Sequence, residues 1–368
     1  MSLTPKLLAT IRSRAEGYDR DNAFFTDDLD DLRAAGYLAP RSLLETARDQ
    51  RLLAAHAPAT ALGINMHHVW VGVARVLHDR GDTSLDWVFQ DAEKGELFAF
   101  GNSEAGNDLV LWDSLTAAES VDGGFAFTGT KIFTSLAPAW TRLGVFGKQA
   151  DGPDGPRLVH GFLTRDAAGV TTLDDWDTLG MRATSSNSTK LDHAVVADDR
   201  ISRFLPVGPN ADPFVFAIFA NFLLLIGSVY AGIADRALEL GVEAVRKRTS
   251  LKTGTTYDQD PDIRWRLADA ALALDALRPD LETLASDVDG VVDHGGDWFR
   301  MLTGAKHRAT ETARYVVDQA MRVAGGGGYR SASELARLQR DVLAGIYHPS
   351  DTESVHSTVA TNLLGPIA

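Results

Sequence analysis

The feature that most constrains the fold is an uncharged run of 21 residues from Phe214 to Ala234, FVFAIFANFLLLIGSVYAGIA. A helix of about 20 apolar residues is long enough to cross a bilayer. The run stands alone, because the chain supplies no second span and the flanks lack the usual aromatic and basic residues. A helix that is apolar on every side also fits the centre of a large helical bundle. We therefore expect a buried core helix and no membrane association.

The hydrophobic pattern divides the chain into three parts in the order α, β, α. Residues 1–97 have apolar residues at spacings of three and four, which predicts helices. Residues 98–205 contain alternating runs and turn signals such as Asp122-Gly123-Gly124, which predicts a β-domain, a small barrel or sandwich. Helical spacing returns in residues 206–368, in long stretches at 214–248, 262–289, 298–324 and 351–364. We expect a multidomain α+β protein.

Composition excludes several classes of function. The chain has no cysteine, which excludes disulfides, zinc-thiolate centres, iron–sulfur clusters and thiol nucleophiles. A net charge of −14 disfavours a general nucleic-acid or anionic-membrane surface. Because there is no H-E-x-x-H motif and no cluster with ligand spacing, we predict no metal site. The start, MSLTPK, lacks the charged and apolar regions of an export signal, which predicts a cytoplasmic protein.

Two adjacent histidines, His67 and His68, lie in a mostly apolar stretch that should be helical. Adjacent positions on a helix diverge by about 100°, so at most one of them should face a given site. A histidine in such a helix is more often a satisfied core residue than a catalyst. Both interpretations stay open.

A third histidine, His348, lies in YHPSDTESVH (347–356), directly before an expected helix start. Ser350 and Glu353 have the spacing of a capping box, which predicts Ser350 as the N-cap. The positive end of the helix disfavours an imidazolium at His348. A histidine kept neutral near pH 7 can accept a proton, so His348 is a candidate base. The alternative is that it only packs or bonds to a backbone carbonyl.

The glycine run VAGGGGYR (323–330) is not a dinucleotide loop, because it follows a helical stretch and lacks the strand–turn–helix context. Alone, it predicts the end of a helix.

Six segments in order resemble the acyl-CoA dehydrogenase superfamily over essentially the whole chain. They are GNSEAGND (101–108), FTGTKIFTS (127–135), WDTLGMRATSSNSTKLDHAVV (176–196), IGSVYAGIADRALELGVEAVRKR (226–248), AMRVAGGGGY (320–329) and LQRDVLAGIY (338–347). The resemblance implies an N-terminal helical domain (1–97), a middle β-barrel or sandwich (98–205) and a C-terminal four-helix bundle (206–368). It also implies FAD between the domains and a homotetramer.

The resemblance assigns roles to individual residues. Ser103 would face the pyrimidine edge of the flavin, Phe133 would cover one face of its ring, and Ser135 would offer a hydroxyl toward N5. The alternative for Phe133 and Ser135 is a core aromatic and a sheet hydroxyl. The other cofactor-binding positions that it implies are Asn107, Arg248, Arg322, Gly325 and Gly326, where glycine lets the backbone approach the cofactor.

The chain also departs from the family pattern. The R-x-x-F-G motif is not kept after Arg246, and Arg322 replaces a glutamine, which makes FMN or loosely held reduced flavin an alternative to FAD. The usual catalytic glutamate falls on Pro349, and a second position that some members use holds Lys247. Neither is a carboxylate, so His348 is the nearest substitute.

Three functions follow from the resemblance and its departures. We favour the two-component flavin monooxygenases, a branch that uses reduced flavin and O2 and often has histidines near the substrate. There, His348 with one of His67 and His68 would deprotonate a phenol or amine, or steady the reacting oxygen, and a flavin reductase would be a partner. The first alternative is acyl-CoA dehydrogenation with histidine as base; the second is a non-catalytic flavin-binding or assembly protein. Whether the substrate is an acyl-CoA or a small aromatic or amine stays open.

Overall fold

The computed structural model describes residues 3–109 and 111–367, so the first two residues of the N-terminal stretch lie outside it. Five helices come first: α1 (Pro5–Asp21), α2 (Thr26–Ala34), α3 (Leu43–Ala54), α4 (Pro58–His78) and α5 (Trp87–Glu93). Their starts follow local sequence signals. The Thr4 side chain caps α1, Ser42 and Glu45 form a capping box at α3, and Pro58 takes the first position of α4.

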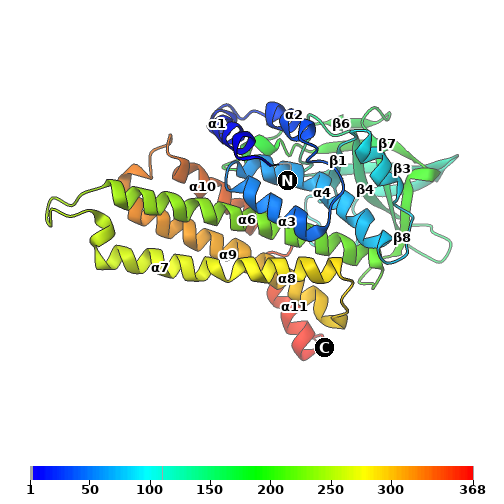
Figure 1. The fold of residues 1–368 in the computed structure, drawn as a ribbon. Helices are drawn as coiled ribbons and strands as arrows, with labels where there is room; N and C mark the ends of the chain where they lie inside the picture. Colours follow the sequence, from blue (N-terminus) through cyan, green and yellow to red (C-terminus); the bar gives the residue numbers. More distant parts are fainter. Residues whose placement is uncertain (1–2, 110, 368) are drawn as a thin grey trace.

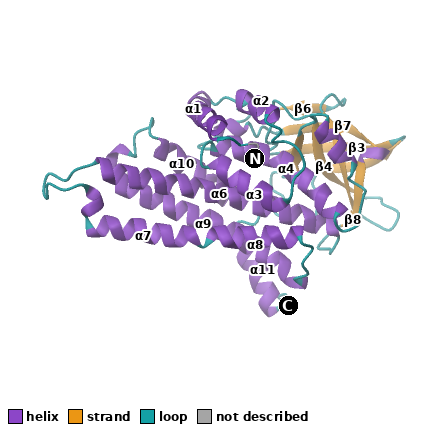
Figure 2. Cartoon of the chain, in the orientation of Figure 1, coloured by secondary structure: helices purple, strands orange, loops and turns teal. Residues whose placement is uncertain are grey.

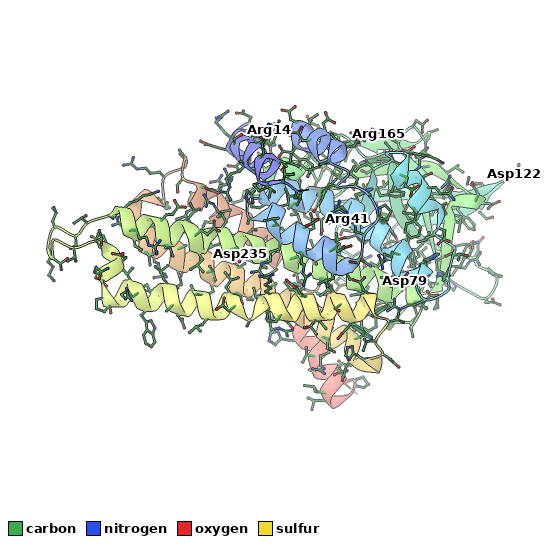
Figure 3. The ribbon with its side chains drawn as sticks, viewed as in Figure 1. Arg14, Arg41, Asp79, Asp122, Arg165 and Asp235 are labelled. Carbon is green, nitrogen blue, oxygen red and sulfur yellow. The ribbon has the colours of Figure 1, made fainter. Side chains whose placement is uncertain are left out.

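The strands lie between Phe98 and Pro206. They are β1 (Phe98–Gly101), β2 (Ala117–Val121), β3 (Gly124–Lys131), β4 (Arg142–Gln149), β5 (Arg157–Thr164), β6 (Val170–Thr172), β7 (Thr189–Ala197) and β8 (Ile201–Pro206). They form one mixed sheet in the order β6-β7-β3-β2-β4-β5-β8, with β1 parallel to β4. The hairpin predicted at Asp122-Gly123-Gly124 is confirmed, because β2 and β3 are antiparallel and Gly123 has a φ of +76°. Asp122 lies at its outer tip (Figure 3).

Helices make up the rest of the chain: α6 (Pro213–Lys247), α7 (Pro261–Asp275), α8 (Leu277–Asp289), α9 (Trp298–Ala324), α10 (Glu334–Val342) and α11 (Thr352–Leu364). The stretch expected at 262–289 is two helices, α7 and α8. The break follows from Pro279, which has no N–H to donate to the carbonyl of Asp275 and so cannot continue α7.

Helix α6 carries the uncharged run and lies inside the helical part of the protein, between α3 and α9 (Figure 1). It is the one helix of the described residues that is long and apolar enough to cross a membrane, and most of its apolar run is buried by the protein itself. The expectation of a core helix is therefore confirmed. Directly after the uncharged run, α6 is tied to α3, where Arg51 donates hydrogen bonds of 2.6 and 2.7 Å to Asp235 (labelled in Figure 3).

The sheet lies at one end of the molecule and the long helices extend away from it (Figure 2). Helix α4 joins the two, because the indole of Trp70 donates to the carbonyl of Ala99 on β1 (2.9 Å). The ring also fits against Gly144 on β4, where a Cβ would lie 2.3 Å from it. The sheet and the bundle meet again where Asp341 accepts a hydrogen bond from the backbone N–H of Met181 (2.6 Å). These contacts hold β1, a strand of the sheet, and the residues after it against the central helices.

Candidate active site

Three of the residues expected at a flavin ring come together where β1 and β3 end. The carbonyl of Ser103 accepts a hydrogen bond from the N–H of Ile132 (2.9 Å), which brings Ser103 beside Phe133 and Ser135. Phe133 has a φ of +54° and is 53% exposed, and its ring meets Trp176 edge-on at 6.2 Å. A left-handed backbone is costly for an aromatic residue, and such strain gathers at functional sites. This aromatic residue is therefore built for a surface contact and not for the core.

The hydroxyl of Ser135 belongs to a chain of hydrogen bonds whose direction is fixed. Thr184 donates its one hydroxyl proton to the carbonyl of Met181 (2.9 Å). The Thr184 oxygen must therefore accept from Ser186 (2.7 Å), and Ser186 must accept from Ser135 (2.7 Å). The proton of Ser135 is consumed in this way. Its oxygen is left as an acceptor for a ligand.

Two buried side chains beside this cluster have polar atoms without a partner among the described residues. Asn102 is 1% exposed and neither its amide oxygen nor its amide nitrogen is paired; the hydroxyl of the fully buried Thr134 is also unpaired. Buried polar atoms are nearly always hydrogen-bonded in folded proteins, so such exceptions point to an absent ligand or water. The carbonyl and N–H groups of an isoalloxazine ring offer the missing partners, and the residues present thus fit a flavin.

A buried ion pair supports the cluster from inside the sheet. The ammonium of Lys131 lies 2.6 Å from the carboxylate of Glu104, which also accepts a hydrogen bond from the hydroxyl of Thr116 (2.6 Å). Burial alone would raise the pKa of Glu104, but Lys131 and these hydrogen bonds lower it to about 2. Burial lowers the pKa of Lys131 to about 8, against the opposing effect of Glu104. Both groups are therefore charged at neutral pH.

Asn107 supports the same loop. Its amide nitrogen donates to Glu104 (2.8 Å) and to the carbonyl of Asp113 (2.9 Å), and its oxygen accepts from the N–H of Leu109 (2.9 Å). These bonds are all internal to the loop, so Asn107 shapes the site without facing it.

His348 lies on the C-terminal side, where its Nε2 is 2.9 Å from the hydroxyl of the buried Tyr230 on α6. A phenol is a better donor than a neutral imidazole, so we place the shared proton on Tyr230 and the ring proton of His348 on Nδ1. Desolvation by the surrounding protein and the nearby Lys306 ammonium lower the pKa of His348 to about 3. The imidazole is neutral at pH 7, as expected, but for a different reason from the one predicted.

The expected N-cap is wrong by one residue. The N-cap of α11 is Asp351, which accepts a hydrogen bond from the N–H of Ser354 (2.9 Å). Ser350 has a φ of +59°, whereas an N-cap needs an extended backbone. A Ser-x-x-Glu pattern next to a Ser-Asp pair does not decide which of the two residues caps the helix.

The paired histidines of α4 diverge as expected. Both nitrogens of His67 bond to backbone, Nε2 to the carbonyl of Leu38 (2.9 Å) and Nδ1 to the N–H of Phe98 (3.3 Å). His67 therefore joins the N-terminal helices to β1 and has no free nitrogen for a substrate. The Nε2 of His68 is buried without a partner among the described residues, and its ring lies edge-on to Tyr37 at 4.8 Å.

The remaining cofactor candidates form a second group at the end of α9. Arg248 donates to the carbonyls of Val323 (3.0 Å) and Ala324 (2.7 Å), and Gly325, with a φ of +64°, leaves room for its guanidinium. Gly326 is open, and Arg322 is exposed beside Asp318 (2.6 Å). The α6–α7 connection that carries Arg248 lies at the end of the bundle away from the sheet (Figure 1). One copy of the chain therefore keeps this group apart from Ser103, Phe133 and Ser135.

Sequence reasoning missed the partners of His348. Tyr230 is one of many buried residues in the uncharged run of α6, so no local pattern distinguishes it. Lys306 is the one cation in the buried stretch of residues 302–306 in α9. A lysine among alanines and glycines on a core-facing position was the available signal.

Comparison with known proteins agrees with the fold. Residues 224–350 match the family described as acyl-CoA dehydrogenase, C-terminal domain. L-evernosamine nitrososynthase from Micromonospora sp. is 30% identical over 61% of this chain, which spans only 53% of that protein. The putative acyl-CoA dehydrogenase YdbM of Bacillus subtilis is 26% identical over 93% of this chain and 91% of its own length.

A solved structure of KijD3 in complex with FMN and a dTDP-linked amino sugar superposes with a TM-score of 0.86 at 24% identity. The match covers 99% of this chain and 92% of that one, and at this identity it establishes the fold. The α–β–α architecture and these likenesses show an acyl-CoA dehydrogenase-like fold, in which residues 224–350 match the family's C-terminal domain.

Proposed function

We propose that this chain is a flavin-dependent monooxygenase that binds reduced flavin and uses O2 to oxygenate a small molecule. The direction of the Ser135–Ser186–Thr184 chain carries this proposal, because it makes Ser135 an acceptor. Reduced isoalloxazine carries a hydrogen on N5 and donates there, whereas N5 of the oxidised ring can only accept. A dehydrogenase must bind the oxidised form, so an acceptor at this position suits an oxygenase.

The state of His348 supports the same choice. Removing the acidic proton of a thioester needs a base whose pKa lies near the operating pH. The pKa of His348 is about 3, and its Nε2 already accepts a hydrogen bond from Tyr230. We therefore favour the second role considered for it: the Nδ1–H donates a hydrogen bond to oxygen that develops negative charge.

The protein's part in the reaction is positioning and hydrogen bonding. Bound reduced flavin supplies two electrons, so that one atom of O2 enters the substrate and the other leaves as water. Phe133 would cover one face of the ring, Ser103 and Asn102 would pair with its polar edge, and Ser135 would accept from its N–H. His348 would face the substrate side together with His68, the member of the α4 pair that keeps an unpaired nitrogen.

The names of the relatives suggest the substrate and the partners. A nitrososynthase acts at an amine, and KijD3 was solved with FMN and an amino sugar nucleotide. We propose an amine-bearing or aromatic small molecule, FMN or FAD in its reduced form, and a separate flavin reductase. We also propose a homotetramer, because Arg248 and Gly325 could join the cofactor site only from a neighbouring copy.

Removing the acceptor should weaken binding of reduced flavin selectively. Ser135→Ala deletes one hydrogen bond worth about 0.5–1.5 kcal/mol, so the Kd of reduced FMN should rise by about 3- to 10-fold. The Kd of oxidised FMN should change little. Ser186→Ala is the matched variant: it frees the Ser135 proton to turn toward the ring, and the preference for reduced flavin should fall. Anaerobic fluorescence titration of both redox forms measures these constants.

The oxygenase activity itself is tested with 18O2. FMN is reduced by an added NADH-dependent reductase, and a dTDP-amino sugar, indole and dibenzothiophene serve as probes. We expect one labelled oxygen atom in the product of a probe. Acyl-CoA dehydrogenation is the second candidate function, because the putative acyl-CoA dehydrogenase YdbM matches 93% of this chain. This second function gains support if the wild-type protein prefers oxidised flavin and no probe is labelled.

A further inference from the structure

Lys306 of α9 is a buried cation with an unusual set of partners. It is 1% exposed, and its ammonium donates to the carbonyls of Gly345 (3.1 Å), His348 (3.1 Å) and Ser350 (3.0 Å). An ammonium has three N–H donors, so all of them are used. None of the ion pairs formed by the described residues includes Lys306. A buried charge is unfavourable unless hydrogen bonds compensate for its lost hydration. Here three backbone carbonyls of one segment provide those hydrogen bonds.

These three carbonyls belong to the irregular turn of residues 345–350 that carries His348. The turn begins in the last residues of a short 3-10 helix (Leu343–Ile346) and ends just before α11, and Lys306 is the donor to the carbonyls of Gly345, His348 and Ser350. It presses closely on the bundle, because a Cβ on Gly345 would lie 2.9 Å from the Tyr230 ring and 3.0 Å from Thr310. Ser350 has a left-handed backbone. Without a donor at its centre, the turn has little to hold it in place.

We propose that Lys306 is a positioning residue that fixes the 345–350 turn through its three carbonyls and so places the His348 imidazole against Tyr230. This deepens the function proposed above and rests on it for its catalytic meaning. His348 is held at two points: its ring by Tyr230 and its backbone by Lys306. The two anchors come from different helices, α6 and α9, which sets both the position and the orientation of the ring.

The anchor needs the charged form of the lysine. A neutral amine has two N–H donors and cannot serve three carbonyls, so loss of the proton frees at least one of them. Burial lowers the pKa of Lys306 to about 8, although Asp351 at the start of α11 and Glu311 on α9 raise it. The other titratable groups that act on it or feel its charge are His348 and His307. The turn should therefore loosen as the pH rises through about 8.

The experiment measures how fast diethyl pyrocarbonate modifies His348 in the full-length chain without flavin. Trypsin cuts after Arg340 and then finds no Lys or Arg up to the end, so His348 and the exposed His356 fall in one peptide. The ratio of their modification, read by fragment masses, corrects for the reagent concentration. In wild type the ratio should be low at pH 7.5, where an exposed imidazole is already mostly neutral, and should rise by about tenfold above pH 8, as expected of a local opening.

Two variants test the same point at pH 7. Lys306→Met should raise the ratio by about tenfold, whereas Lys247→Met, an exposed lysine near the end of α6, should leave it unchanged. Lys306→Cys gives a single cysteine in a chain that otherwise has none, so 2-bromoethylamine alkylates it selectively in urea before refolding. The aminoethyl side chain restores the ammonium, and the low ratio should return.

The outcomes separate the two proposals. A ratio that stays flat from pH 7 to 9.5 in wild type overturns the anchor, and so does an unchanged ratio in a folded Lys306→Met. If Lys306→Met does not fold, the wild-type pH series and the alkylated Lys306→Cys decide. An anchor that behaves as expected in a chain that oxygenates no probe leaves the anchor standing and the proposed function refuted. With active enzyme, turnover should fall through about pH 8 while KM stays constant, a profile that a purely structural lysine would not give.

Discussion

His348→Ala should lower turnover by about 10- to 100-fold, because a hydrogen bond to a charged group contributes about 1.5–3 kcal/mol. The loss should appear in kcat, since the developing charge exists only in the transition state. Steady-state product formation with externally reduced FMN measures it. Tyr230→Phe should have a smaller effect in the same direction, because it frees Nε2 and lets the ring proton move away from Nδ1.

The control for this prediction is His356→Ala, which removes an exposed histidine of α11 and should leave turnover unchanged. Circular dichroism melting should be similar for all three variants. Unchanged kcat in His348→Ala would remove this residue from the mechanism.

Lys131→Met should lower the free energy of unfolding by about 3–5 kcal/mol, because it leaves the Glu104 carboxylate charged and buried without its partner. The double variant with Glu104→Gln should regain much of this loss, since it removes the uncompensated charge. Lys148→Met is the matched control: its pair with Asp113 is partly exposed, and such pairs contribute about 0–1 kcal/mol. Urea unfolding of wild type and these three variants measures the differences. A double variant less stable than Lys131→Met would contradict the ion-pair account.

The same pair makes the protein sensitive to acid. The folded pKa of Glu104 is about 2, below its ordinary value of 4.5, so its contribution to stability is complete above pH 4.5 and is lost as the pH falls toward 2. Lys131 stays charged throughout this window, because its pKa is about 8. The acid loss should therefore be smaller in the double variant.

The order of the domains and the central helix were predictable because they depend on patterns that run over many residues. A 21-residue run without charge must be buried either in the protein or in a membrane, and in α6 most of it is buried in the protein, as expected. Alternation around Asp122-Gly123-Gly124 likewise led to the correct hairpin. Local details were harder. Pro279 splits one expected helix into two, and the cap of α11 shifts from Ser350 to Asp351 because two neighbouring residues compete for one role.

Only the part of the site that lies within sequence motifs could be predicted. Motifs similar to those of a known family pointed to Ser103, Phe133 and Ser135, and the pairing of Ser103 with Ile132 brings these residues together. The direction of the Ser135 hydroxyl depends on Thr184 and Met181, about 50 residues away, and no local pattern contains it. Lys306 and Tyr230 meet His348 only through the packing of three helical segments. Whether a histidine acts as base or as donor depends on such partners.

We propose that none of the described residues at this site can take the α-proton of a thioester, and the function proposed here depends on this point. The most direct measurement mixes the chain with oxidised FAD, and separately with FMN, and adds butyryl-, octanoyl- and isovaleryl-CoA in the absence of O2. If the account is right, the 450 nm absorbance of the flavin persists and the α-position of the thioester gains no deuterium in D2O. Rapid bleaching of that band by any of the three would show that a working base is present, and the oxygenase proposal would be wrong.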